Sequence, residues 1–113
     1  TYRAKWDEDS PEFTGTTSVR ARLEPALERR VILVALRAFS TLGLRDYGRV
    51  DLRLDARGVP RVIEVNPNSD LAEGTGIARQ AARQGISYPE LVAGVAALAL
   101  ARIHRPKEAP WTT

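Results

Sequence analysis

The chain has 113 residues, a mass of 12.5 kDa and a net charge of +3, and 43% of its residues are hydrophobic. This composition is typical of a folded unit of one domain or less, which is too small to enclose a substrate by itself. The absence of cysteine excludes disulfides and thiolate chemistry, and the single histidine excludes a metal site built from several histidines. The arginines are scattered along the chain, which argues against a nucleic-acid-binding surface. No apolar run approaches the roughly 20 residues of a membrane span.

The first part of the chain predicts a weak strand, a loop and one long helix. Residues 1–6 alternate weakly, and residues 7–17 have the polar and turn-forming composition of a loop. From Pro25, which suits the first turn of a helix, apolar side chains recur every three or four residues as far as Leu42. Gly43 follows the last apolar step and suits a C-terminal cap. We therefore expect an amphipathic helix over about residues 25–42.

Residues 47–65 predict a β-hairpin. Apolar and charged residues alternate over residues 49–54 (RVDLRL), residues 55–58 (DARG) suit a turn, and residues 59–66 form the return strand. If the turn pairs Leu54 with Val59, or slips from that register by an even number of residues, each strand has two distinct faces. One face then carries Arg49, Asp51, Arg53, Val62, Glu64 and Asn66, and the other, which we expect to be core, carries Val50, Leu52, Leu54, Ile63 and Val65.

A polar loop and two helices complete the chain. The loop covers residues 66–76, and residues 77–84 predict a short helix that stops at Gly85. Residues 87–90 (SYPE) form a capping box at the start of a second helix, which continues to Ile103. The expected fold is α+β, an antiparallel β-sheet with helices packed on one face. We expect one domain over residues 1–105 and a flexible tail over residues 106–113.

The polar face of the hairpin brings two carboxylates and an amide, Asp51, Glu64 and Asn66, within cross-strand reach of one another. Carboxylates this close repel unless a positive charge neutralises them. Oxygen ligands at this spacing suit Mg²⁺, which takes one or two carboxylates and completes its shell with water and phosphate. The neighbouring arginines could equally form an exposed salt-bridge lattice, and Asn66 before Pro67 also suits a turn. The pattern alone leaves both interpretations open.

Three stretches of the chain resemble the C-terminal part of ATP-grasp ligases, and within that superfamily the D-alanine–D-alanine ligases. They are residues 47–51 (YGRVD), 61–68 (RVIEVNPN) and 85–92 (GISYPELV). The family has an R-[VI]-D strand, an E-x-N strand end and a G-[IMLV]-S-[YF]-x-x-L helix start in this order and spacing. Residues 2–6 (YRAKW) also resemble the family's Y-x-A-K-Y strand. The likeness extends from residue 2 to about residue 102.

The resemblance implies roles for residues of the polar face. Asp51, Glu64 and Asn66 match the ligands of one or two Mg²⁺ ions, for which Mn²⁺ could substitute, and Glu64 thereby helps to hold the phosphates of ATP. Arg49 matches the catalytic arginine that stabilises the acyl phosphate and the tetrahedral intermediate. Lys5 matches a lysine near the transferred phosphate, although a solvated strand lysine would look the same in sequence.

The resemblance also implies a substrate-binding loop end. Thr75 falls where the family usually has a serine that binds the carboxylate of the acceptor. Gly74 and Gly76 flank Thr75 just before a helix, where free N–H groups favour an anion. Simple loop flexibility would account for the two glycines equally well.

The implied activity is that of a ligase in which ATP converts a carboxylate to an acyl phosphate and an amine then attacks to form a peptide or amide bond. The expected partners are ATP, small carboxylate and amine substrates, the upstream domains of the same protein and a second copy in a homodimer. We expect no binding to nucleic acid or to a membrane, and we expect the protein to be cytoplasmic. The first residue is Thr1 rather than Met, and the family's nucleotide-grasping domain lies upstream of such a segment. We therefore expect this chain to be a fragment that is inactive alone.

Two departures from the family pattern keep other functions open. Ser69-Asp70 stands in place of the family's Pro-Gly, whose glycine N–H serves the oxyanion hole. An aspartate there adds a negative charge and lacks the backbone conformational freedom of glycine. Trp6 replaces a tyrosine of the family's loop-closing network. The alternatives are an ATP-grasp ligase with a different substrate pair, and a non-catalytic domain that keeps the fold for assembly.

Overall fold

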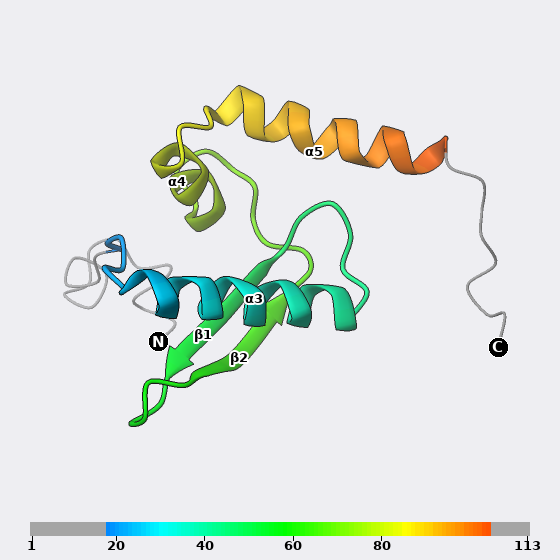
Figure 1. Ribbon diagram of the computed structural model, residues 1–113. Helices are drawn as coiled ribbons and strands as arrows, with labels where there is room; N and C mark the ends of the chain where they lie inside the picture. Colours follow the sequence, from blue (N-terminus) through cyan, green and yellow to red (C-terminus); the bar gives the residue numbers. More distant parts are fainter. Residues whose placement is uncertain (1–17, 105–113) are drawn as a thin grey trace, which may run out of the picture.

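A computed structural model describes residues 18–104, which form a small α+β domain of two antiparallel strands and three helices (Figure 1). The elements in chain order are α3 (Pro25–Thr41), β1 (Arg49–Leu54), β2 (Pro60–Asn66), α4 (Gly76–Arg83) and α5 (Tyr88–Ile103). Helix α3 packs against both strands, and α4 packs against α5. The predicted fold class is confirmed. The strand and loop predicted over residues 1–17, and the predicted tail, lie outside the described residues.

The three helices begin and end where their local sequence signals predict. Helix α3 starts with Pro25 as its first residue, and Gly43 after it has a φ of 68°. Gly85, which follows α4, has a φ of 81°. At the start of α5 the Ser87 hydroxyl accepts the N–H of Glu90, and the Glu90 carboxylate accepts the N–H of Ser87 at 2.9 Å. This capping box is confirmed.

The hairpin forms as predicted, but its register changes midway. Near the turn Leu54 pairs with Pro60 and Leu52 with Val62, whereas beyond the irregularity Asp51 pairs with Glu64. Ile63 is the extra residue of a β-bulge. Because a bulge shifts the register by one residue, it changes which side chains share a face. The prediction that Val62 lies on the face of Glu64 is therefore wrong, since Val62 is opposite Leu52, and Ile63, at 62% exposure, is not core.

The apolar side chains of the described part are mostly only half-covered. Among the buried apolar residues are Ala78 and Pro60, whereas Ile32, Leu33 and Leu36 of α3 are each at least half exposed. No single helix in residues 18–104 has the length and hydropathy of a membrane span. Helices α4 and α5 reach those limits only together, across a bend of 105°.

Candidate functional site

The polar face of the hairpin lies at the end of the sheet remote from the turn. Arg49 pairs with Asn66, and Asp51 pairs with Glu64, two positions further along the antiparallel ladder. Side chains at paired positions and at alternate positions lie on the same face of a sheet. The register therefore places these four residues on one face, as the alternation predicts, because the bulge lies on the turn side of all of them. Arg53, which the alternation predicts on the same face, pairs with Arg61 beyond the bulge.

Arg49 and Asp51 form a bidentate ion pair within β1. Arg49 Nε donates to Asp51 Oδ1 at 2.8 Å, and Nη2 donates to Oδ2 at 3.0 Å. The bond to Asp51 is the main reason that the pKa of Arg49 is raised, and the charge of Glu64 raises it further against the effect of partial burial. Arg49 thus stays charged. Its guanidinium has five N–H donors, of which the bonds to Asp51 use two, so among residues 18–104 three remain for another anion.

Glu64 and Asn66 present further oxygen atoms on this face. Glu64 is exposed, and no ion pair engages it within residues 18–104. Asn66 is half-buried, and its Oδ1 accepts the N–H of Asn68 at 3.0 Å. That bond is the turn role which the sequence leaves open for Asn66. A carbonyl oxygen has two lone pairs, so the amide retains one acceptor position.

The oxygen donors fit a hard divalent cation of the Mg²⁺ class. Residues 18–104 hold no group of three or more His, Asp or Glu side chains placed for a metal. The predicted set instead has two carboxylates and one amide, which suits an ion that takes the rest of its shell from water and phosphate. Arg49 already neutralises Asp51, as the alternative interpretation expects, but within the described part of the chain it forms no ion pair with Glu64.

Thr75 is the N-cap residue of α4, but its hydroxyl does not cap the helix. The hydroxyl oxygen lies 2.9 Å from the carbonyl oxygen of Asp70 and 2.7 Å from that of Ala72, so its one proton is directed into the loop. No side chain caps the first turn of α4. Gly76 begins this turn, and Gly74, with a φ of 82°, shapes the approach to it. Uncapped N–H groups at a helix start can bind an anion.

Ser69 and Asp70, which depart from the family pattern, have an unexpected local structure. Ser69 is 3% exposed, and its hydroxyl has no hydrogen-bond partner among the described residues. Asp70 is exposed, and its Oδ1 accepts the N–H of Ala72 at 2.8 Å. Within residues 18–104 the one non-glycine residue with positive φ is Asp46, so position 70 does not require glycine. The added negative charge and the buried Ser69 hydroxyl are therefore the differences from the family pattern that remain at these two positions.

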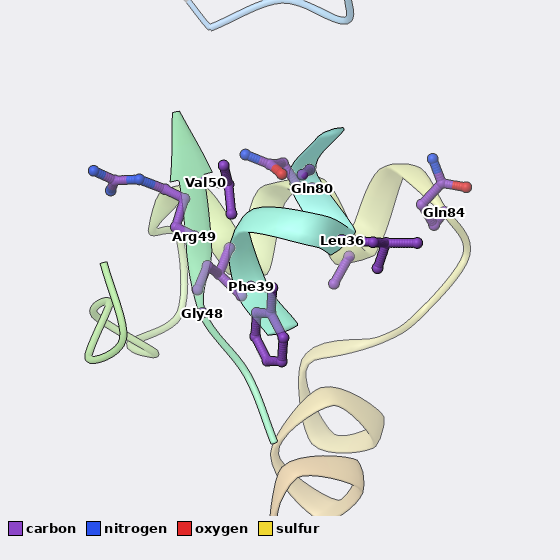
Figure 2. Close-up of a pocket in the computed structure, with 10 residues that line it drawn as sticks. Leu36, Phe39, Gly48, Arg49, Val50, Gln80 and Gln84 are labelled. Atoms are coloured by element: carbon purple, nitrogen blue, oxygen red, sulfur yellow. The ribbon is translucent and has the colours of Figure 1, made fainter. Parts of the chain in front are cut away.

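A mostly apolar cavity of about 420 Å³ lies between α3, β1 and α4. Leu36, Phe39 and Ile77 contribute to its lining. Arg49 also lines this cavity, although Figure 2 shows that its guanidinium points away from Leu36 and Phe39. None of the predicted oxygen ligands lines this cavity.

Two contacts near the site are not predictable from the sequence. The hydroxyl of Tyr47 donates to Asn68 Oδ1 at 3.1 Å, and Arg102 of α5 binds the carboxylate of Asp46 at 2.6 and 3.3 Å. Tyr47 and Asn68 are 21 residues apart, and Asp46 and Arg102 are 56 apart. Tyr47 and Asn68 lie in motifs that carry the family resemblance, but the motifs do not reveal that the two residues meet. Lys5 and Trp6 lie outside the described residues.

Comparisons with known proteins identify the family. The family described as D-ala D-ala ligase C-terminus matches residues 1–96. The D-alanine–D-alanine ligase of Haemophilus influenzae is 31% identical over 99 residues, which are 88% of this chain and 32% of that protein. The corresponding ligase of Burkholderia cenocepacia is 36% identical over 99 residues, which are 88% of this chain and 30% of that protein.

A solved structure gives the same result. The D-alanine–D-alanine ligase of Bacillus anthracis, determined in complex with ATP, superposes with a TM-score of 0.74 and 27% identity over 82% of this chain and 32% of that one. The chain thus spans about a third of the length of these relatives. By sequence over most of its length and by fold, the chain belongs to the D-alanine–D-alanine ligase C-terminal family of ATP-grasp proteins.

Proposed function

We propose that this chain supplies the Mg²⁺-binding half of the ATP site in an ATP-dependent carboxylate–amine ligase. The observation that carries the proposal is that Arg49, Asp51, Glu64 and Asn66 occupy one face of the hairpin at alternate register positions. Asp51, Glu64 and Asn66 would hold the ion, whose charge, when bound, neutralises the phosphates of ATP. Lys5, which the family resemblance places near the transferred phosphate, would add a second positive charge.

Arg49 would provide the catalytic positive charge. Its ion pair with Asp51 fixes the guanidinium on the polar face, and the N–H groups that remain can bind a phosphoryl oxygen or a developing oxyanion. The first turn of α4, with Gly76 and Thr75, would bind the carboxylate of the acceptor through its uncapped N–H groups. Binding and electrostatics, rather than a covalent enzyme intermediate, would supply the rate enhancement.

A substitution that removes one charge tests this proposal in the full-length protein. Glu64→Gln should abolish ATP turnover because it weakens metal binding, and it should leave the melting temperature unchanged because Glu64 is exposed. Glu28→Gln removes the same charge from the first turn of α3 and should retain full turnover. Full turnover in Glu64→Gln would instead favour the non-catalytic assembly domain.

The identity of the substrates is a second question, because Asp70 adds negative charge beside the loop that ends at Thr75. Thr75 contacts the carbonyl oxygen of Asp70, so the two residues lie close together. A ligase with a substrate pair other than two D-alanines is therefore the second candidate. A screen of amino acids and amines that scores phosphate release by the full-length protein separates the two, since release with D-alanine alone would exclude a different pair.

A further inference from the structure

Tyr47 connects the two ends of the hairpin at the site. It lies just before β1, whereas Asn68 lies just after β2, and the Tyr47 hydroxyl donates to Asn68 Oδ1 at 3.1 Å. Tyr47 is half-buried, so the position of its ring is partly fixed by packing. The bond therefore holds the second residue after the E-x-N strand end against the second residue before the R-[VI]-D strand.

Asn68 in turn fixes the side chain of Asn66. The backbone N–H of Asn68 donates to Asn66 Oδ1 at 3.0 Å. This bond sets the orientation of the amide, because the opposite orientation would place the Asn66 NH₂ group against another donor. The second lone pair of Oδ1 remains available on the polar face. Substitution of a partner that orients a ligand in this way typically costs about 10- to 100-fold in metal affinity or activity.

Tyr47 is itself held by an unusual backbone segment. Asp46 before it has a φ of 63°, which is rare for a residue other than glycine. The Tyr47 N–H donates to the carbonyl oxygen of Arg45 at 2.7 Å, and Arg102 of α5 binds the Asp46 carboxylate through two hydrogen bonds. These contacts define the point from which the Tyr47 side chain extends toward Asn68.

We propose that Tyr47 is a positioning residue for the metal ligand Asn66 and acts through Asn68. The inference rests on the proposed function, because it assigns Asn66 to the cation. Tyr47 touches neither the cation nor a substrate in this assignment. Its hydroxyl restrains Asn68, and Asn68 restrains the amide oxygen that faces the ion.

The test measures metal binding directly in the full-length protein. Tyr47→Phe removes one hydroxyl and keeps the ring. Binding of Mn²⁺ at a fixed ADP concentration, followed by the EPR signal of free Mn²⁺, should weaken by about tenfold. Tyr88→Phe removes a hydroxyl from the first turn of α5 as the matched control and should leave Mn²⁺ affinity unchanged. The melting temperatures of both variants should equal that of the wild type.

A second variant and a kinetic measurement complete the test. Asn68→Ala should weaken Mn²⁺ binding to a similar extent, and the double variant should be no weaker than either single variant, because both substitutions break one chain of contacts. In Tyr47→Phe the Mg²⁺ concentration for half-maximal turnover should rise, while turnover at saturating Mg²⁺ is retained.

Three results would overturn the inference. Unchanged Mn²⁺ affinity in Tyr47→Phe, with binding by the wild type intact, would refute the positioning role and leave the proposed function standing. Additive losses in the double variant would show that Tyr47 does not act through Asn68. No Mn²⁺ binding by the wild type would refute both the positioning role and the assignment of the metal site.

Discussion

Arg49 binds Asp51 from two positions away on the same strand, with Nε–Oδ1 at 2.8 Å and Nη2–Oδ2 at 3.0 Å. Both side chains remain partly exposed, at 33% and 40%. An arginine and a metal ion are alternative partners for one carboxylate, because each neutralises the charge that the other would bind. The proposed catalytic arginine and the proposed metal site are therefore coupled through Asp51.

This coupling predicts opposite effects on metal binding and on turnover. Arg49→Met in the full-length protein should bind Mn²⁺ several-fold more tightly than the wild type, since Asp51 is released and a nearby positive charge is lost. Turnover should nevertheless fall by at least about 100-fold, the scale of losing one transition-state donor. Arg53→Met, on the same strand beyond the bulge, is the control. Weaker Mn²⁺ binding in Arg49→Met would contradict the competition.

The two serines at positions 69 and 87 should respond to alanine in opposite directions. Ser69→Ala should stabilise the protein by about 1 kcal/mol, because it removes a buried hydroxyl that has no partner in the described part. Ser87→Ala should destabilise it by about 1 kcal/mol, because it removes the cap of α5. Urea denaturation measures both changes. A loss of stability in Ser69→Ala would reveal a hydrogen-bond partner of that hydroxyl.

The turn of the hairpin should contribute a pH-dependent part of the stability. The backbone N–H of Val59, followed by that of Arg57 and by the side chain of Arg61, holds the pKa of Asp55 below its ordinary value of 3.8. A carboxyl with a lowered pKa in the folded state stabilises the fold above its ordinary pKa, and this contribution is lost as the pH falls through the lowered value.

Asp55→Asn tests this sign. The melting temperature of the variant should lie below that of the wild type at pH 7, and the difference should shrink as the pH is lowered past 3.8. A protonated carboxyl resembles the amide of asparagine, so the two proteins should converge at the lowest pH. A difference that stays constant from neutral pH to well below the ordinary pKa would contradict the assignment.

Arg102 ties the end of α5 to the loop before β1. The Asp46 carboxylate is the main reason that the pKa of Arg102 is raised. Arg102→Gln should therefore increase amide hydrogen exchange in the last turns of α5, with little change in α3, because α5 loses its bond to Asp46. Arg37→Gln, within α3, is the control. Equal exchange in α5 of Arg102→Gln and the wild type would show that the pair does not restrain the helix.

Local signals in the sequence are sufficient to locate the helices and the hairpin. Pro25, Gly43 and the Ser87–Glu90 box act within a few residues of themselves, so they carry their structural consequences in any folded context. The alternation over residues 49–54 likewise suffices to place Arg49 and Asp51 on one face, because side chains two apart on a strand point the same way. The roles assigned to Lys5, Thr75 and the oxygen ligands remain predictions.

The bulge at Ile63 is a feature that local sequence signals do not predict. Its effect depends on how β2 fits both its partner strand and the helix packed on the sheet, and neither is encoded in the spacing of residues within β2. The same holds for the Tyr47–Asn68 bond. The sequence by itself determined the elements and the chemical type of the polar face, because period, caps and turn residues act over short distances. Only the tertiary structure decided the register, the pairing of Arg49 with Asp51 and the restraint on Asn66, because these depend on the relative placement of backbone segments and on side-chain rotamers.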